Sequence, residues 1–207
     1  MRLRQLVIAV YCVSIGHGGL ALADPLTATA THKAEVLEEN AASGAKASPP
    51  PASQAISPAE AQAVDPAGQA PLDDALTCLA RSIYWEAKGG SQGDMEDVAS
   101  VVMNRLGQAG FPGTVCGVVK QGSEHNNCQF SWWCDGRADQ AEENDRYTLA
   151  KDVARKALNR QLVDRTHGAQ YFHDHSVTPA TFTSMVRTAQ SSRFVFYRPR
   201  GEQAPGK

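Results

Sequence analysis

Apolar residues in the second half of the chain recur at three- and four-residue spacings, the period of helices that bury one face. This pattern predicts helices over 73–87, 94–106 and 140–162, and a short helix over 115–120. Asp94 is the predicted N-cap of the second helix, and Asp73 or Asp74 is the predicted N-cap of the first. The carboxylate of a capping residue accepts hydrogen bonds from the free backbone N–H groups of the first turn.

Strand-like patterns are confined to the C-terminal part of the chain. Residues 170–173 and 194–198 are rich in aromatic and β-branched side chains, and they predict two strands. Residues 121–138 show no regular pattern. The expected fold is therefore a single, mainly α (α+β) domain over 73–200 with a small β element, followed by a tail at 201–207.

The segment 24–72 has a different composition. No aromatic residue occurs between Asp24 and Ile83, and residues 41–70 contain eleven Ala, five Pro and four Ser. Such a composition buries too little apolar surface to offset the loss of chain entropy on folding. We predict a disordered tether over 24–72, with at most a marginal helix over 28–42. A tether of this kind could reach or dock to a protein partner in the cell envelope.

The first 23 residues have the features of a secretory signal peptide. Arg2 and Arg4 precede an apolar run over 6–15, and Ala21-Leu22-Ala23 forms a cleavage site. The run is shorter than the about 20 residues that a membrane-spanning helix needs. An uncleaved anchor is the alternative, which the glycines at 16–19 weaken. We expect export to the periplasm or cell envelope, without stable membrane insertion after cleavage.

Export would place the cysteines in an oxidising compartment. Cys12 would leave with the signal peptide, and the four remaining cysteines favour two disulfides. Three pairings are possible. We favour a local Cys128–Cys134 link together with a Cys78–Cys116 link between separate segments.

The charge balance excludes one class of partner. From residue 73 to the end there are 16 Lys and Arg and 16 Asp and Glu, so the net charge is zero. No basic stripe is apparent, and nucleic acid is therefore not an expected partner.

One carboxyl lies on the apolar side of the first predicted helix. Leu76, Leu79, Ile83 and Glu86 fall within roughly 80° of arc on one helix face. Glycines follow at once and leave room for a ligand. A carboxyl at such an edge loses solvation, which raises its pKa and suits it to act as a general acid near neutral pH. The alternative is a glutamate that borders the core and points into water.

A second candidate is the sequence Gln-Phe-Ser-Trp-Trp at 129–133, which is flanked by Cys128 and Cys134. Aromatic rings beside amide and hydroxyl groups suit sugar binding, because sugar faces stack on rings and sugar hydroxyls need polar partners. The alternative is that the rings fill the core beneath a loop. We expect one tryptophan to be buried and the other to lie near the cleft.

Several side chains could in principle bind zinc, namely His125, Cys128, Cys134, His173, Asp174 and His175. Their spacing matches no common zinc pattern, and oxidised cysteines would not be free to bind metal. We predict no metal site and no cofactor. A Cys–His nucleophile is disfavoured for the same reason, and the chain has no nucleophile elbow and no phosphate-binding glycine loop.

Short motifs occur in a consistent order across 77–198. They are Cys78-Leu79-Ala80, Ile83-Tyr84-Trp85-Glu86-Ala87-Lys88-Gly89, Val101-Val102-Met103-Asn104-Arg105, Phe111-Pro112, Val115-Cys116, Cys128-Gln129-Phe130-Ser131-Trp132-Trp133-Cys134-Asp135-Gly136, Tyr171 with His173, and Phe196-Tyr197-Arg198. Together they resemble the cell wall hydrolase family that includes spore cortex-lytic enzymes. The resemblance implies a lysozyme-like, lytic-transglycosylase-like fold that acts on the glycan strands of peptidoglycan, with Glu86 as the catalytic glutamate.

We expect five residues of these motifs to contact the substrate: Gln129, Ser131, Trp133, Tyr171 and His173. The chain departs from the family pattern at Gly90 and near Asp94, and also at Thr181 and Phe194, where the family often carries a Trp and a His. These departures concern the far wall of the cleft and hence the preference for substrate.

Glu86 has no second acid with a comparable environment nearby in the sequence. This favours a lytic transglycosylase, in which the 6-hydroxyl of N-acetylmuramic acid is the nucleophile. One alternative is a muramidase that uses water, with Asp135 or Glu124 as the second carboxylate. Another is a non-catalytic peptidoglycan-binding module. An amidase or endopeptidase has the least support, because a convincing zinc or Cys–His site is missing.

Overall fold

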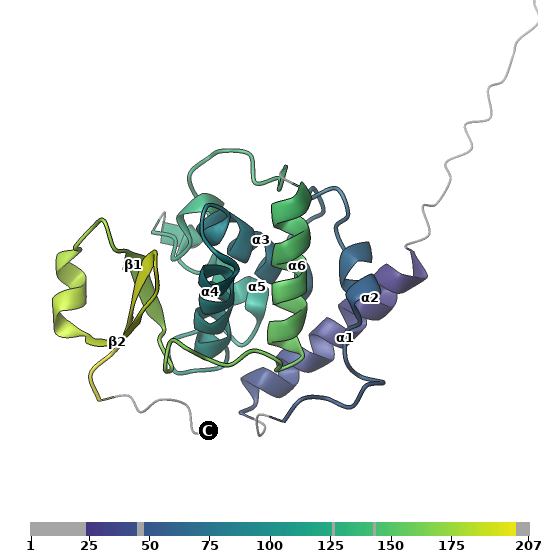
Figure 1. Cartoon of the computed structure of the whole chain (residues 1–207), viewed down its shortest axis with the longest axis horizontal. Coiled ribbons are helices and arrows are strands. Elements are labelled where there is room, and N and C mark those ends of the chain that lie inside the picture. The colour runs from purple at the N-terminus through teal and green to yellow at the C-terminus, as the bar shows by residue number, and fades with distance from the viewer. Residues whose placement is uncertain (1–23, 45–47, 126, 143, 202–207) are drawn as a thin grey trace, which may run out of the picture.

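The computed structural model describes residues 24–44, 48–125, 127–142 and 144–201. Its helices and strands are α1 Pro25–Ala42, α2 Pro58–Ala63, α3 Ala75–Ala87, α4 Gln92–Arg105, α5 Val115–Lys120, α6 Asn144–Leu158, β1 Tyr171–Asp174, β2 Val186–Gln190 and β3 Phe194–Arg198 (Figure 1). The predicted signal peptide and nearly all of the predicted tail lie outside the described residues. Within the described ranges, no helix is both long and apolar enough to cross a membrane.

Helix α3 is the centre of the helical part and packs against α4, α5 and α6 (Figure 1). Its apolar side chains are buried, including Leu76, Leu79 and Ile83. Asp74 caps the helix by accepting a hydrogen bond from the backbone N–H of Thr77 at 2.9 Å. The helix predicted over 73–87 is thus confirmed to within two residues.

Helix α4 begins slightly earlier than predicted, because its N-cap is Ser91 and not Asp94. Asp94 is the third helical residue, and its carboxylate accepts a hydrogen bond from the backbone N–H of Ser91 at 2.8 Å. The Ser91 hydroxyl in turn accepts one from the backbone N–H of Asp94, which completes a reciprocal capping box. Helix α6 is shorter than the predicted 140–162, and Arg160 just beyond it has a left-handed backbone with φ 55°.

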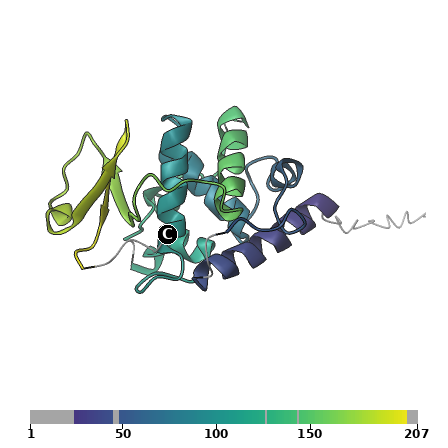
Figure 2. The ribbon, with the colours of Figure 1, turned by 60° about the horizontal axis from the view of Figure 1, so that its bottom comes forward.

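The prediction of a disordered tether over 24–72 is wrong for 24–44 and 48–72, the parts of it that the structure describes. Helix α1 runs along one side of the other helices, and α2 lies beside it (Figure 2). Ala30, Ala34 and Leu37 of α1 are buried. The small side chains of Ala30 and Ala34 let the helix approach closely, so tertiary packing compensates for the scarcity of large apolar residues.

Buried polar contacts also join the N-terminal segment to the rest of the fold. The Asp65 carboxylate pairs with the Arg81 guanidinium at 2.8 Å and accepts a hydrogen bond from the Tyr147 hydroxyl at 2.6 Å. The Asn159 side chain bonds to both the N–H and the C=O of Ile56, at 2.9 and 2.8 Å. The folded unit therefore starts well before residue 73.

A three-stranded antiparallel sheet lies at the opposite end of the molecule from α2 (Figure 1). The strand order is β1-β3-β2, with Tyr171 opposite Tyr197 and Phe172 opposite Phe196. β1 and β3 correspond to the two predicted strands, whereas β2 was not predicted. The small sheet on a mainly helical domain confirms the predicted fold class.

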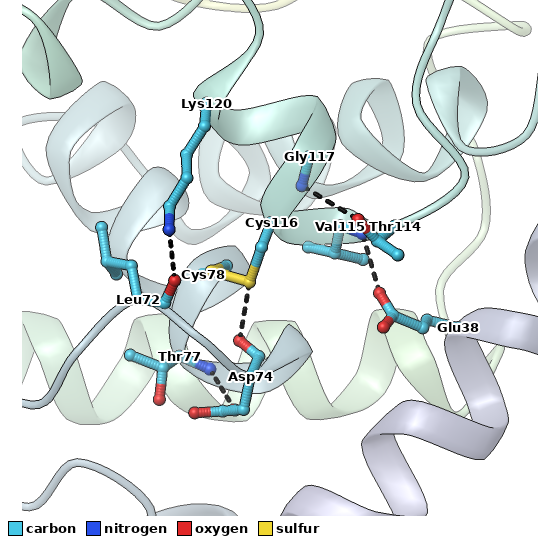
Figure 3. Close-up of a disulfide and its surroundings, with 10 residues drawn as sticks. All are labelled: Glu38, Leu72, Asp74, Thr77, Cys78, Thr114, Val115, Cys116, Gly117 and Lys120. Carbon is cyan, nitrogen blue, oxygen red and sulfur yellow. Dashed lines mark hydrogen bonds between the residues drawn. A yellow bond between two sulfur atoms is a disulfide. The ribbon is translucent and has the colours of Figure 1, made fainter. Parts of the chain in front are cut away.

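Both favoured disulfides are present. Cys78 of α3 is bonded to Cys116 of α5, and Cys128 is bonded to Cys134 across a short loop. Figure 3 shows the first disulfide and its polar surroundings, where Lys120 donates to the Leu72 carbonyl at 2.6 Å. In the same region Glu38 of α1 accepts a hydrogen bond from the Val115 backbone at 2.7 Å (Figure 3). The disulfide thus lies where α1, α3 and α5 meet.

Candidate active site

Glu86 lies in the last turn of α3 and lines a cavity of about 310 Å³. The cavity is bordered by the end of α3, the C-terminal end of α4, the loop closed by the Cys128–Cys134 disulfide, and the sheet. Its lining residues are Glu86, Arg105, Cys128, Gln129, Ser131, Tyr171, Phe172, His173, Asp174, Phe182, Arg193 and Phe194. Segments more than 100 residues apart in the sequence therefore meet around one carboxyl.

The environment of Glu86 favours its protonated form. Burial raises its pKa from an ordinary value of 4.5 to about 7, although the positive charges of Arg193 and Arg105 act in the opposite direction. A carboxyl with a pKa near 7 can both hold and release a proton at neutral pH. This is the property required of a residue that serves as general acid and then as general base.

Four of the five predicted contact residues line this cavity: Gln129, Ser131, Tyr171 and His173. His173 is held by two neighbours, because its Nδ1 lies 2.8 Å from the Asp174 carbonyl and its Nε2 lies 3.1 Å from the Tyr197 hydroxyl. A carbonyl can only accept, so Nδ1 carries the proton, and in the neutral ring Nε2 accepts from the hydroxyl. His173 therefore presents a fixed ring to the cavity.

Trp133 is the exception, because it is not among the residues that line the cavity. Its ring is half-buried, packs edge-on against Trp132 at 6.1 Å and lies under the Lys120 ammonium at 5.0 Å. Ser131–Trp133 forms a 3₁₀ turn, in which successive side chains point about 120° apart. Ser131 takes the direction toward the cavity, whereas Trp133 does not line it. Trp132 is buried, so the expectation of one buried tryptophan is confirmed, and a position of Trp133 near the cleft stays a prediction.

Arg105 also lines the cavity, and the sequence did not identify it as a site residue. Its side chain is buried, donates to the Gln170 carbonyl at 2.6 Å, and lies 5.1 to 5.4 Å from three aromatic ring centres. Those rings belong to Phe111, Phe130 and Tyr171. A buried guanidinium at the end of α4 gives the cavity a fixed positive charge.

Asp174 and Arg193 also line the cavity and were not predicted as site residues. The Arg193 Nε donates to the Asp174 carboxylate at 3.2 Å. The pKa of Asp174 is lowered, first by the hydrogen bonds from Ser176 and then by Arg193, so this carboxylate is ionised at neutral pH. Its partner lies about twenty residues away, a separation that carries no periodic signal in the sequence.

Asp135 and Glu124, the carboxylates considered for a hydrolytic mechanism, do not line this cavity. Asp135 is exposed and accepts a hydrogen bond from the Arg137 backbone, and Glu124 lies on an exposed 3₁₀ turn. In the part of the chain that the structure describes, no three His, Cys, Asp or Glu side chains are grouped closely enough to hold a metal ion.

One of the positions that depart from the family pattern lies in the cavity wall. Phe194 lines the cavity and packs edge-on against Phe172 at 5.0 Å. Thr181 is exposed, and the adjacent Phe182 lies 4.9 Å from the His173 ring centre. Phe182 therefore supplies an aromatic surface in this part of the wall.

Two solved structures resemble the chain. They are the catalytic domain of the SleB protein from Bacillus cereus and the catalytic domain of the germination-specific lytic transglycosylase SleB from Bacillus anthracis. Each is 23% identical with a TM-score of 0.48; the first match covers 59% of this chain and 88% of that chain, and the second covers 63% and 98%. At this identity and TM-score, the likeness does not establish which reaction the chain catalyses. No curated protein matches the chain.

The family model described as Cell Wall Hydrolase matches residues 89–197, which is just over half of the chain. This range contains all of the cavity-lining residues except Glu86, which lies three residues before it. The chain belongs to the cell wall hydrolase family.

Proposed function

We propose that this protein is a lytic transglycosylase that cleaves peptidoglycan glycan strands between N-acetylmuramic acid and N-acetylglucosamine. The observation that carries the proposal is Glu86, a carboxyl with a pKa near 7 in a cavity with polar and aromatic walls. Membership of the cell wall hydrolase family supports peptidoglycan as the substrate.

In the proposed reaction, protonated Glu86 donates its proton to the glycosidic oxygen as the bond to C1 of N-acetylmuramic acid breaks. The resulting carboxylate then removes the proton from the 6-hydroxyl of the same sugar. The 6-oxygen bonds to C1, which gives a 1,6-anhydromuramoyl end and returns Glu86 to its protonated form. One carboxyl serves both steps, and neither a metal nor a cofactor takes part.

A muramidase is the second candidate, and Asp174 is the observation that favours it. Its ionised carboxylate lines the same cavity as Glu86, as a base that activates water would. Asp174 is already engaged by Arg193 and by the Ser176 backbone. These contacts restrict its access to a water molecule, so we rank this mechanism second.

We further propose that the protein acts outside the cytoplasm, in the periplasm or cell envelope. The signal-peptide pattern at residues 1–23 and the two disulfides support this location.

The test is mass spectrometry of the soluble products after the oxidised chain digests purified peptidoglycan. We expect products that end in 1,6-anhydromuramic acid, and Glu86→Gln should abolish them while the protein stays folded. Glu124→Gln is the matched control, because Glu124 is an exposed glutamate outside the cavity. It should retain full activity.

Other outcomes separate the alternatives. Reducing muramic ends would indicate hydrolysis and make Asp174→Asn the next variant. If Glu86→Gln retained full activity, the proposed role of Glu86 would be wrong. If the folded, oxidised wild type released no products but bound glycan strands, the protein would be a binding module.

A further inference from the structure

Arg193 lines the cavity, and its backbone is held by hydrogen bonds to two neighbouring segments. Its backbone carbonyl accepts a hydrogen bond from the His175 N–H at 2.9 Å, beyond the end of β1. Its own N–H donates to the Ser191 hydroxyl at 3.3 Å, within the turn between β2 and β3. Arg193 is thus bonded both to the segment that follows β1 and to the turn between β2 and β3.

The turn that carries Arg193 is itself anchored to α4. The Ser191 hydroxyl donates to the Asp94 carboxylate at 2.6 Å, and the Ser192 hydroxyl donates to the same carboxylate at 3.1 Å. Asp94 is buried, and it belongs to the capping box that begins α4. This network links the start of α4 to the turn that carries Arg193.

The Arg193 guanidinium group lies between the Asp174 carboxylate and Gly89. Its Nε donates to the Asp174 carboxylate at 3.2 Å. Its Nη1 lies over Gly89, where a Cβ atom would come within 3.1 Å of it. Gly89 follows Glu86 by three residues at the end of α3, so the positive charge is placed beside the helix end that carries the carboxyl.

We infer that Arg193 is a positioning residue that stabilises the carboxylate form that Glu86 adopts between the two proton transfers of the proposed reaction. This inference rests on the proposed function, in which Glu86 acts first as a protonated acid and then as an ionised base. Such a mechanism needs the free energies of the protonated and ionised forms to be similar. Burial alone would hold the proton too strongly. A partly exposed cation beside the carboxyl lowers the free energy of the ionised form without removing the acid.

Other charged and titratable groups face Glu86 from the surrounding elements. They are Arg105 from α4, and Tyr171, His173 and Asp174 from β1. Arg105 is buried and bonded to the Gln170 carbonyl, so its removal would disturb the packing of α4. The Arg193 side chain is 37% exposed, and it is therefore the better residue for testing the effect of charge.

The test is the pH titration of the Glu86 carboxyl by 13C NMR in the oxidised chain, with Glu86→Gln used to assign the signal. Arg193→Gln should raise the pKa of Glu86 by about 0.5 to 1, because a nearby positive charge is lost. Arg193→Lys keeps the charge and should leave this pKa nearly unchanged. Arg187→Gln, an exposed arginine on β2 outside the cavity, is the matched control and should have no effect.

A second variant tests the same charge without removing the arginine. Gly89→Ala would push Nη1 away, and it should raise the pKa of Glu86 in the same direction by less. The alkaline limb of kcat/KM should shift with the pKa in each variant. The inference is overturned if neither Arg193→Gln nor Gly89→Ala changes the pKa of Glu86, or if Arg193→Lys changes it as much as Arg193→Gln. The NMR titration needs no substrate, so it stays informative even if no anhydro products form.

Discussion

The N-terminal helices α1 and α2 and the C-terminal sheet over 171–198 occupy different parts of the molecule, with α2 at the opposite end from the sheet (Figures 1 and 2). The first region, over 24–72, lies outside the family match, and it includes polar groups with buried partners, such as Asp65 with Arg81 and the Ile56 backbone with Asn159. The second lies almost entirely within the match, and β1 is only half-buried along its length.

The two regions contribute to different properties, the first to the stability of the fold and the second to the proposed activity. Polar groups of the N-terminal segment that are removed from water contribute to folding because each has a partner. Groups on the sheet that face the cavity are partly exposed, so a substrate can reach them. We therefore expect changes in the first region to alter stability and changes around the second to alter activity.

The largest expected effect is on stability, from Asp65→Ala. Its loss leaves the buried Arg81 guanidinium without its carboxylate partner. Breaking a buried pair from one side costs about 3–5 kcal/mol in the free energy of unfolding, which urea denaturation would measure. Glu39→Gln, an exposed position on α1, should change it by less than about 0.5 kcal/mol. A large loss of kcat/KM in the Asp65 variant while it is still folded would contradict the expectation that the N-terminal segment affects stability and not activity.

The two disulfides give the next comparison. Replacing Cys78 and Cys116 by alanine should cost about 4 kcal/mol, because the link closes a separation of 38 residues. Replacing Cys128 and Cys134 should cost about 2 kcal/mol, because that separation is only 6 residues. The second pair should nevertheless lower kcat/KM more, since Gln129 and Ser131 lie in its loop. The reverse order in activity would show that the loop is positioned by other contacts.

Glu86 itself should lower stability as the pH rises. Its pKa is about 7 in the folded protein against an ordinary value of 4.5, so between these values the folded state binds more protons than the unfolded state. Stability therefore falls as the pH rises through this window. Glu86→Gln should gain about 1–3 kcal/mol over the wild type between pH 4 and pH 8, measured by denaturation at both values. A constant difference between the two proteins would mean that Glu86 is solvated.

The smallest effect in free energy is expected from Gln129→Ala. Gln129 is exposed and lines the cavity, so its loss should leave the melting temperature unchanged. Losing one substrate hydrogen bond should lower kcat/KM about tenfold. Asn127→Ala, an exposed neighbour outside the cavity, should lower it little. Equal effects of the two variants would remove Gln129 from the proposed substrate contacts.

Local pattern was sufficient for the elements and residues that depend on near neighbours. The helical period placed Glu86 on the buried side of α3, and the short spacing of Cys128 and Cys134 favoured their link. Four of the five predicted contact residues line the cavity, because the motifs that contain them form its walls. The sequence by itself therefore determined the helical core and identified Glu86 as the candidate carboxyl, whereas it left three disulfide pairings possible and only favoured the one observed.

Tertiary structure decided the features that depend on distant partners. The alanine-rich segments 24–44 and 48–72 have little tendency to fold alone, and the second is joined to the core by contacts of Asp65 with Arg81 and Tyr147. Arg193 reaches the end of α3 from more than 100 residues away, and Trp133 turns from the cavity because of a single 3₁₀ turn. Such arrangements arise from long-range packing and charge compensation, which leave no periodic signal along the chain.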